Sequence, residues 1–387
     1  MPSKRYLMTP GPTPVPPAVA AAMARPLVHH RTAEFRAVLA RALARLREVY
    51  RTDAEVGLFT SSGTGGMESA VANICERGDR VVCVSAGNFG ERWIALAHAY
   101  GCDVVPVRYE WGETPAADDV AAALADAGGA KAVFLTHSET STGVVADVGE
   151  IAARVAGSGA LVVVDAISSL GAVPLETDAW GLDVVVAGSQ KALMTPPGLA
   201  TVSVSEAALA AANDAATARF YFDWERVLKA QREDRPATPF TPAITLVYGL
   251  DAALEILLAE GLDAAFDRHV RLGRACRAGA KAMGLELFSP DDDRSVVVTA
   301  IRMPGEVDGA AVIRAVSERH GITLEGGRGA LAGKIVRIGH IGYVDVFDVT
   351  AALTALEQVL ADLGTDVERG VAAAAALEAF GGEAVRV

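Results

Sequence analysis

Short valine-rich runs alternate with helical patterns between about residues 55 and 205, and this alternation restricts the fold more than any other feature of the sequence. The runs are Val81–Val84, Val104–Val107, Ala132–Leu135, Leu161–Val164 and Val184–Val186. They are continuously apolar, as in strands buried on both faces, and the spacing between them fits crossover helices. We therefore expect an α/β fold with a mostly parallel sheet that carries helices on both sides.

The 387-residue chain has the length of about two domains. The proline-rich stretch Thr9–Pro17 is unsuited to a helix or a central strand, so we expect an extended arm lying over the surface. Helical periodicity is interrupted at Gly261, and the following strands are fewer and more widely spaced. We assign residues 1–20 to an N-terminal arm, 21–255 to a large domain and 256–387 to a smaller α+β domain.

Charge and cysteine content exclude several classes of function. A net charge of -13 without a basic stretch argues against a nucleic-acid partner. Cys75, Cys83, Cys102 and Cys276 lack CxxC spacing, so we expect neither a disulfide framework nor a metal site. Met1–Met8 has no hydrophobic signal core, and no run of about 18 apolar residues predicts a membrane span. These features predict a cytoplasmic protein with no membrane partner.

Two chemically active side chains follow neighbouring strands of the predicted sheet. Asp165 ends the run Leu161–Val164, and Lys191 follows the run Val184–Val186. Each alone could be a helix cap or a surface charge, but ligands of such sheets bind at the carboxyl ends of the strands. A desolvated lysine forms Schiff bases, and a carboxylate paired to a pyridine nitrogen keeps that ring protonated. The pair therefore indicates pyridoxal phosphate chemistry.

A glycine-rich loop, Ser61–Gly66, precedes a helical pattern. Such a loop presents backbone N–H groups and the positive end of a helix dipole to an anion, although a tight turn would also use glycines. The dinucleotide motif GxGxxG fails because Glu68 occupies its third glycine position. A single phosphate is therefore the better prediction.

With these motifs in order along nearly its whole length, the chain resembles the class V aminotransferases of pyridoxal phosphate fold type I, in particular the alanine-glyoxylate and serine-glyoxylate group. The resemblance lies in Pro10–Thr13, Ser62–Gly65 with Glu68, Thr136–Val144, Val164–Gly171, Gly188–Leu193, Pro196–Gly198 and Gly333–Gly339. It implies a large domain with a mostly parallel sheet of the seven-stranded type, a smaller domain, and transfer of an amino group from a small amino acid, alanine or serine, to glyoxylate or a similar 2-oxo acid.

The resemblance also implies roles for individual residues. Lys191 is expected to carry pyridoxal 5'-phosphate as a Schiff base and to shuttle a proton, and Asp165 to pair with the pyridine nitrogen. Phe89 is expected to stack on the cofactor ring, with a core phenylalanine as the alternative. Ser141 is expected near the phenolic oxygen, although it could cap a turn. The phosphate is expected to be bound by Ser62, Gly63, Thr64 and Gln190.

Substrate and subunit contacts follow from the same resemblance. Arg337 is expected to bind the substrate carboxylate, with Gly11 beside the substrate, because a guanidinium matches a carboxylate in two-pronged geometry. A neighbouring subunit is expected to complete the phosphate site through Thr241 and Thr238, which requires a homodimer. Thr64 and Thr238 depart from the histidine and tyrosine of animal relatives, so phosphate contacts are expected to be rearranged.

Other substrates and reactions stay open at this point. A cysteine desulfurase is disfavoured because Gln190 precedes Lys191 and the loop Gly326–Gly329 lacks a cysteine. Phosphoserine- or aspartate-type aminotransferases are the main alternatives. The sequence does not fix the amino donor, since alanine, serine, aspartate and ureidoglycine differ only in side-chain contacts. His29–Arg31 resembles a phosphate-binding pair of phosphoserine aminotransferases but also occurs in glyoxylate-type relatives.

Overall fold

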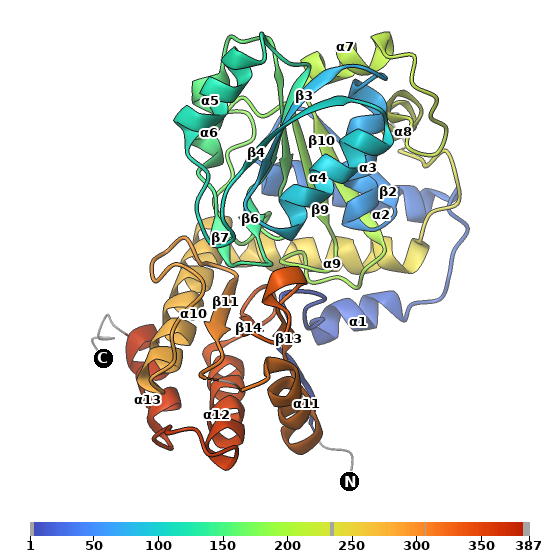
Figure 1. Ribbon diagram of the computed structural model, residues 1–387. Coiled ribbons are helices and arrows are strands. Elements are labelled where there is room, and N and C mark those ends of the chain that lie inside the picture. The colour runs from blue at the N-terminus through green and yellow to red at the C-terminus, as the bar shows by residue number, and fades with distance from the viewer. Residues whose placement is uncertain (1–3, 233–235, 306, 382–387) are drawn as a thin grey trace.

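The computed structural model describes residues 4–232, 236–305 and 307–381. A large sheet contains seven strands: β2 (Glu55–Thr60), β3 (Arg80–Ser85), β4 (Asp103–Arg108), β5 (Ala132–Thr136), β8 (Leu161–Asp165), β9 (Val184–Gly188) and β10 (Leu199–Val204). Their order across the sheet is β2-β10-β9-β8-β5-β3-β4, and only β10 runs antiparallel to its neighbours. The predicted mostly parallel α/β sheet is confirmed (Figure 1).

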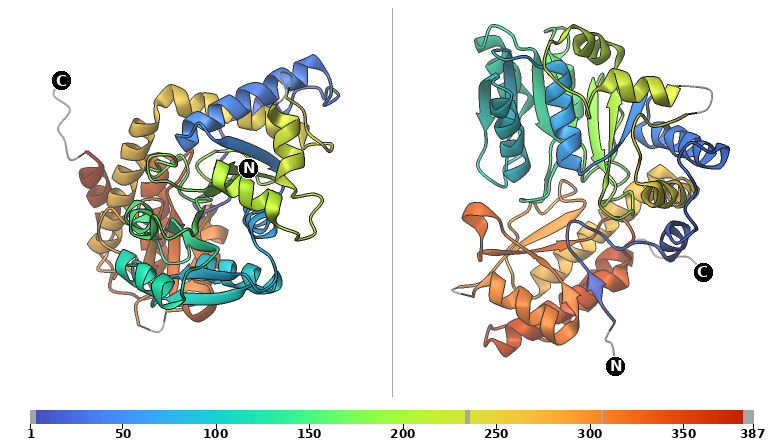
Figure 2. Two further views of the ribbon diagram at one scale, coloured as in Figure 1. Left: turned by 90° about the horizontal axis from the view of Figure 1, so that it is seen from above. Right: turned by 90° about the vertical axis from the view of Figure 1, so that its right-hand side faces the viewer.

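Helices cover both faces of the large sheet, as Figure 2 shows. Alternate strand residues point to opposite cores, so that Val162 and Val164 pack into one core while Val163 packs into the other. The first core includes α1 (Pro17–Met23), α2 (Ala33–Tyr50), α5 (Ala117–Asp126), α6 (Val148–Val155) and α9 (Ile244–Glu260). The second includes α3 (Gly63–Ile74), α4 (Asn88–Ala99), α7 (Glu206–Asp214) and α8 (Trp224–Arg232).

The C-terminal third of the chain forms a second sheet with its own helices, packed around a separate hydrophobic core. An antiparallel sheet is made by β11 (Val298–Arg302), β14 (Ile335–Gly339) and β13 (Glu325–Gly326). Its helices are α10 (Leu262–Ala282), α11 (Gly309–His320), α12 (Val346–Asp362) and α13 (Val371–Gly381). The separate core supports the predicted division into two domains, which stays a prediction; residue 255 lies inside α9, before the break at Gly261.

The remaining elements are short. They are β1 (Tyr6–Leu7) paired with β12 (Ile322–Thr323), β6 (Ser138–Glu139) paired with β7 (Val144–Val145), and a 3-10 turn at Gly329–Leu331. The β1–β12 pair is parallel and brings the N-terminal segment next to the C-terminal third of the chain (Figure 1).

The N-terminal arm differs from the expectation that it lies over the surface. Met8, Thr9 and Pro10 are buried, and the backbone groups of Met8 bond to Thr323 and Gly339. An irregular segment can be buried when its polar backbone groups find partners, and here the strands β12 and β14 supply them. The arm therefore forms part of the interior beside Lys191.

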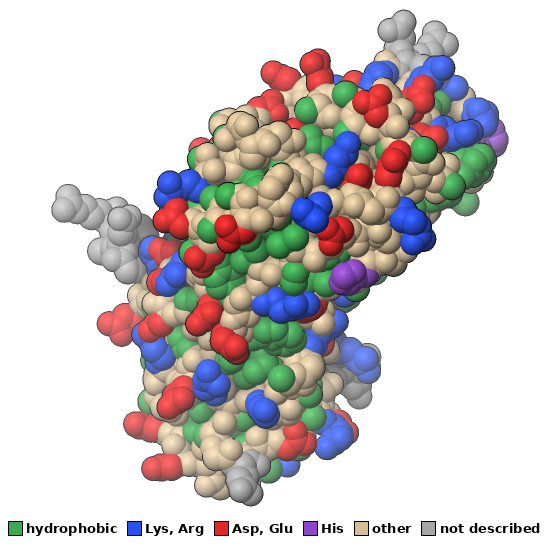
Figure 3. Space-filling view, turned by 45° about the horizontal axis from the view of Figure 1, so that its top comes forward, with side chains coloured by type: hydrophobic (Ala, Val, Ile, Leu, Met, Phe, Trp, Pro, Cys, Tyr) green, Lys and Arg blue, Asp and Glu red, His purple; other side chains and the backbone are tan. Residues whose placement is uncertain are grey.

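The surface carries both signs of charge. On the face in Figure 3, Lys and Arg side chains are interspersed with Asp and Glu, and apolar side chains lie between them. Among the helices in the described residues, none is long and apolar enough to cross a membrane.

Candidate active site

Lys191 and Asp165 lie at the ends of adjacent strands. Asp165 closes β8, and Lys191 follows β9 after a turn through Ser189 and Gln190. Only 8% of Lys191 and 4% of Asp165 is exposed to solvent. Burial raises the pKa of Asp165 to about 7, against the hydrogen bond that its Oδ1 accepts from the backbone N–H of Ile167 at 2.8 Å. Burial lowers the pKa of Lys191 to about 8, although nearby Asp165 opposes this shift.

The N-terminal arm holds Lys191 in position. The Lys191 Nζ donates a hydrogen bond to the carbonyl of Pro10 at 2.7 Å, and the Thr13 hydroxyl donates to the Lys191 carbonyl at 3.0 Å. A Cβ atom on Gly11 would lie 2.4 Å from Nζ, and Gly11 has a φ of 141°. A side chain at position 11 would therefore occupy the space of the lysine amine.

The glycine-rich loop opens α3 close to the same strand end. Ser62, the N-cap residue, makes no side-chain capping bond, and a Cβ on Gly63 would lie 2.5 Å from the side chain of Ile167, two residues after Asp165. Nη1 of Arg92 donates to the Thr64 hydroxyl at 2.9 Å. These contacts bring the uncapped helix N-terminus next to the end of β8.

Gln190 joins this group through its position beside Lys191. Its Oε1 atom is buried and has no hydrogen-bond partner among the described residues. A buried amide end without a partner is expensive unless a ligand satisfies it, so the side chain is available to a bound group.

Phe89 and Ser141 are held together by Glu139. This buried carboxylate accepts the backbone N–H of Phe89 at 2.8 Å and of Gly90 at 3.1 Å, together with the Ser141 hydroxyl. The Ser141 Oγ accepts the Asn88 N–H at 3.0 Å. Burial raises the pKa of Glu139, and these hydrogen bonds oppose that shift. The Phe89 ring is partly buried under the Arg92 guanidinium, 4.7 Å from its centroid.

Arg337 lies on β14 and is almost fully buried. Its Nε donates to the Gly326 carbonyl at 2.8 Å and its Nη1 to the Thr140 carbonyl at 2.6 Å. Its Nη2 is 3.5 Å from Oε1 of Glu325, too long for a hydrogen bond, and has no hydrogen-bond partner. Burial lowers the pKa of Arg337 to about 10, with Glu325 opposing the shift. Nη2 of this rigidly held cation is thus left without a hydrogen-bond partner.

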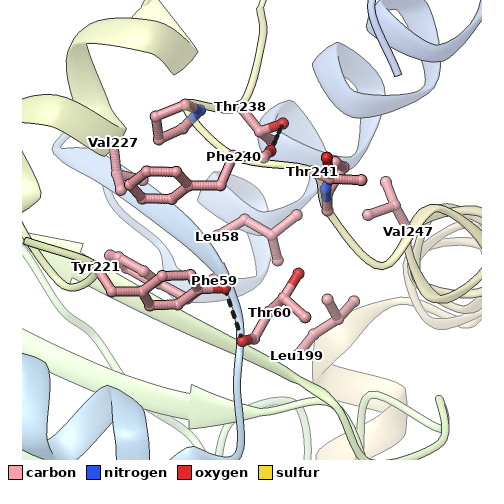
Figure 4. Close-up of a pocket in the computed structure, with 12 residues that line it drawn as sticks. Leu58, Phe59, Thr60, Leu199, Tyr221, Val227, Thr238, Phe240, Thr241 and Val247 are labelled. Atoms are coloured by element: carbon pink, nitrogen blue, oxygen red, sulfur yellow. Dashed lines mark hydrogen bonds between the residues drawn. The ribbon is translucent and has the colours of Figure 1, made fainter. Parts of the chain in front are cut away.

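Thr238 and Thr241 lie elsewhere. They line a pocket with Thr60, Tyr221 and Phe240, in which the Thr238 hydroxyl donates to the Phe240 carbonyl at 2.7 Å (Figure 4). Lys191 and Asp165 do not line this pocket, so the single chain does not bring the two threonines to the predicted site. Their action in a neighbouring subunit stays a prediction.

His29–Arg31 lies between α1 and α2. The His29 and His30 rings are in contact at 4.5 Å, and the Arg31 N–H bonds to Nδ1 of His29. Its contacts are therefore local.

Sequence reasoning missed three side chains of the site. Arg92 stands three residues after Phe89, a helical spacing that puts both on one face of α4. Glu139 lies inside the family-like stretch Thr136–Val144, but its role depends on a fold that brings it to the start of α4. Ile167 packs against Gly63, a contact between segments about a hundred residues apart that no local pattern reveals.

The residues present fit pyridoxal phosphate on observations of the chain itself. An amine and a carboxyl group are buried at adjacent strand ends, an uncapped helix N-terminus lies beside them, and Gln190 and Arg337 each have a buried polar atom without a hydrogen-bond partner. Buried polar groups of this kind are costly without a ligand. The set therefore has the chemistry of a site for an aldehyde with a phosphate group and for a carboxylate.

Residues 5–349 match the family described as Aminotransferase class-V. The chain belongs to this family. Class V aminotransferases use pyridoxal phosphate, so the chain is a pyridoxal phosphate-dependent transaminase of fold type I, as the sequence predicted. A serine–glyoxylate aminotransferase of Methylorubrum extorquens is 38% identical, over 97% of this chain and 96% of the relative. An L-aspartate–glyoxylate aminotransferase of Paracoccus denitrificans is also 38% identical, over 98% and 97%.

A solved structure agrees with these sequence relatives. The ureidoglycine-glyoxylate aminotransferase of Bacillus subtilis superimposes with a TM-score of 0.93 at 32% identity, over 98% of this chain and 99% of that one. Another relative, 44% identical over 97% of this chain and 98% of its own length, is named the small subunit of a soluble hydrogenase from Synechococcus. In the described part of this chain, no cluster of three or more His, Cys, Asp or Glu side chains could hold a metal ion.

Proposed function

We propose that this aminotransferase moves the amino group of a small amino acid, alanine or serine, to glyoxylate or a similar 2-oxo acid in two half-reactions at one site. The observation that carries the proposal is the grouping of a buried amine, a buried carboxyl group and a buried guanidinium whose Nη2 has no hydrogen-bond partner: Lys191, Asp165 and Arg337. The names of relatives that act on glyoxylate support the acceptor. Phosphoserine- and aspartate-type transamination are the alternatives.

The chain supplies the groups that such a transfer needs. Bound pyridoxal phosphate supplies an electron sink, and Asp165 would keep its ring nitrogen protonated. Lys191 would hold the cofactor, be released by the incoming amine, and then carry a proton between the substrate α-carbon and the C4' carbon. Its pKa, lowered to about 8, leaves a useful fraction of the amine neutral near neutral pH. Arg337 would bind the carboxylate that donor and acceptor share, with Gly11 leaving room beside it.

The remaining predicted residues would hold the cofactor in place. Phe89 would stack on the ring and Ser141 would approach the phenolic oxygen. The phosphate would be bound by Ser62, Gly63, Thr64 and Gln190. The described structure adds Arg92, whose guanidinium lies over Phe89 and bonds to Thr64, as a cation beside this group.

The protein is also proposed to act as a homodimer. The pocket in Figure 4 has Tyr221 stacked on Phe240, with ring centroids 5.2 Å apart, and Tyr221 and Phe220 are 40% and 64% exposed. Exposed aromatic side chains near Thr241 are typical of an interface. Light scattering should give twice the chain mass, and Thr241→Ala should weaken binding of the cofactor. A monomer with full activity would overturn the shared site.

We place the protein in the cytoplasm. All four cysteines are unpaired and buried, which suits a reducing compartment. Localisation of a tagged full-length chain tests this placement.

A half-reaction experiment tests the substrate class. Single amino acids are added to the cofactor-loaded protein while its visible absorbance is followed, and glyoxylate is then added. Alanine or serine should bleach the band and glyoxylate should restore it. If only glutamate or phosphoserine bleaches the band, the fold and cofactor of this chain stand, but the proposed substrates are wrong.

A further inference from the structure

Two further charged side chains, Glu325 and Arg328, lie beside the proposed substrate site and have no role in the transfer described above. Glu325 is on β13 directly opposite Arg337 on β14, and its Oε1 is 3.5 Å from Nη2 of Arg337. The same oxygen is 3.8 Å from Nη2 of Arg328. The charges of Arg337, Arg328 and Glu325 also shift the pKa of Lys191, so this group bears electrostatically on the reacting amine.

Glu325 is not needed to hold Arg337 in place. Backbone carbonyls of Gly326 and Thr140 already fix the guanidinium through Nε and Nη1. The carboxylate of Glu325 makes ion pairs with both arginines at distances beyond hydrogen-bond range, and 38% of its side chain is exposed. Its main effect is therefore its negative charge at the site, rather than the orientation of a neighbour.

The charges balance for a substrate with one carboxylate. Arg337 and Arg328 contribute two positive charges and Glu325 one negative charge, which leaves a single positive charge. This count covers the three groups joined by ion pairs, Glu325, Arg328 and Arg337. Asp165 would pair with the cofactor ring, and Glu139 forms no ion pair with these groups, because its carboxylate accepts backbone N–H groups and the Ser141 hydroxyl. A second substrate carboxylate would bring an uncompensated negative charge next to Glu325, which complementary sites avoid.

We propose that Glu325, held in balance by Arg328, restricts this enzyme to monocarboxylic amino acids and 2-oxo acids and rejects dicarboxylic ones such as aspartate and oxaloacetate. This proposal rests on the proposed function and narrows its substrate class. It also separates the chain from an aspartate-type alternative that the sequence left open.

Three variants test the charge balance. The measured quantity is the ratio of kcat/KM for aspartate to kcat/KM for alanine, with glyoxylate as acceptor. Glu325→Gln leaves two positive charges, so this ratio should rise roughly tenfold, the effect of one partly screened charge at this range. Arg328→Gln leaves no net charge and should lower kcat/KM for both donors. The double variant restores one positive charge and should return the ratio to that of the wild type.

The double variant separates charge from structural damage. Damage to the loop would add in the double variant, whereas compensating charges cancel. An unchanged ratio in Glu325→Gln, an aspartate rate equal to that of alanine in the wild type, or additive losses in the double variant would each overturn the proposal.

Inert carboxylates keep this test independent of the proposed reaction. Propionate and succinate bind without transferring an amino group, and their affinity for the cofactor-loaded protein can be measured by calorimetry. The wild type should bind propionate more tightly than succinate. Glu325→Gln should raise the ratio of succinate affinity to propionate affinity by the same factor of roughly ten. If no donor reacts with glyoxylate but this shift occurs, the proposed function fails and the selectivity stands. If transfer occurs without the shift, the selectivity fails alone.

Discussion

Replacing Arg337 by lysine keeps a positive charge on β14 but removes the planar guanidinium. In the structure Nε and Nη1 are used by backbone carbonyls, so Nη2 is the donor left for a substrate carboxylate. A lysine cannot satisfy both carbonyls and still present a fixed donor. Loss of one hydrogen bond to a charged group costs about 2–3 kcal/mol, which corresponds to an increase in KM of about 30- to 150-fold.

The assay is steady-state kinetics with the donor and the acceptor varied in turn. Both substrates carry the same carboxylate, so both KM values should rise by similar factors while kcat changes less. Arg302→Lys is the matched control, because Arg302 is on the adjacent strand β11 and is exposed. Unchanged KM values for both substrates in Arg337→Lys, or an equal effect in the control, would refute the assignment of Arg337 to carboxylate binding.

Three further predictions concern the lysine and its surroundings. Asp165→Asn should lower transamination by at least about a hundredfold, because it removes a preorganised charge. In the cofactor-free chain, burial raises the pKa of the Asp165 carboxyl to about 7, so between about pH 4 and pH 7 the folded chain keeps a proton that the unfolded chain has lost; this carboxyl therefore lowers the free energy of unfolding as pH rises, and the variant should lack that contribution. Equal pH dependence of denaturant unfolding in both chains would count against this pKa. The rate at which pyridoxal phosphate attaches to the cofactor-free chain should rise with pH through a midpoint near 8, because Lys191 reacts as the neutral amine and its pKa is lowered to about 8; stopped-flow absorbance showing a midpoint near the ordinary 10.5 would contradict this. Gly11→Ala should prevent attachment while leaving circular dichroism unchanged, because its Cβ would lie 2.4 Å from Nζ.

Much of the sheet was predictable because its strands are buried on both faces. The valine-rich runs predicted β3, β4, β5, β8 and β9 within a residue or two. Strand β10 was missed because it alternates polar with apolar residues: Thr201 and Ser203 are buried, and the Thr201 hydroxyl is 2.7 Å from that of Tyr50 on α2. Such polar side chains look like a surface strand until their distant partners are known.

The site was predictable where chemistry follows a strand end and unpredictable where it depends on distant contacts. Asp165 and Lys191 follow strands, and the structure brings them together as expected. The arm was expected on the surface, but the Pro10 carbonyl accepts a hydrogen bond from Lys191, 181 residues away in sequence. The sequence alone did not single out Glu325, because its importance comes from the strand register that places it opposite Arg337.

The most direct test of the central claim is to locate the residue that carries the cofactor. The cofactor-loaded protein is reduced with borohydride, which converts an imine to a stable amine, and is then digested and analysed by mass spectrometry. The account predicts a single pyridoxyl phosphate adduct on Lys191 and none in Lys191→Ala, which should also lose transamination. An adduct on another lysine, or full turnover by Lys191→Ala, would contradict it.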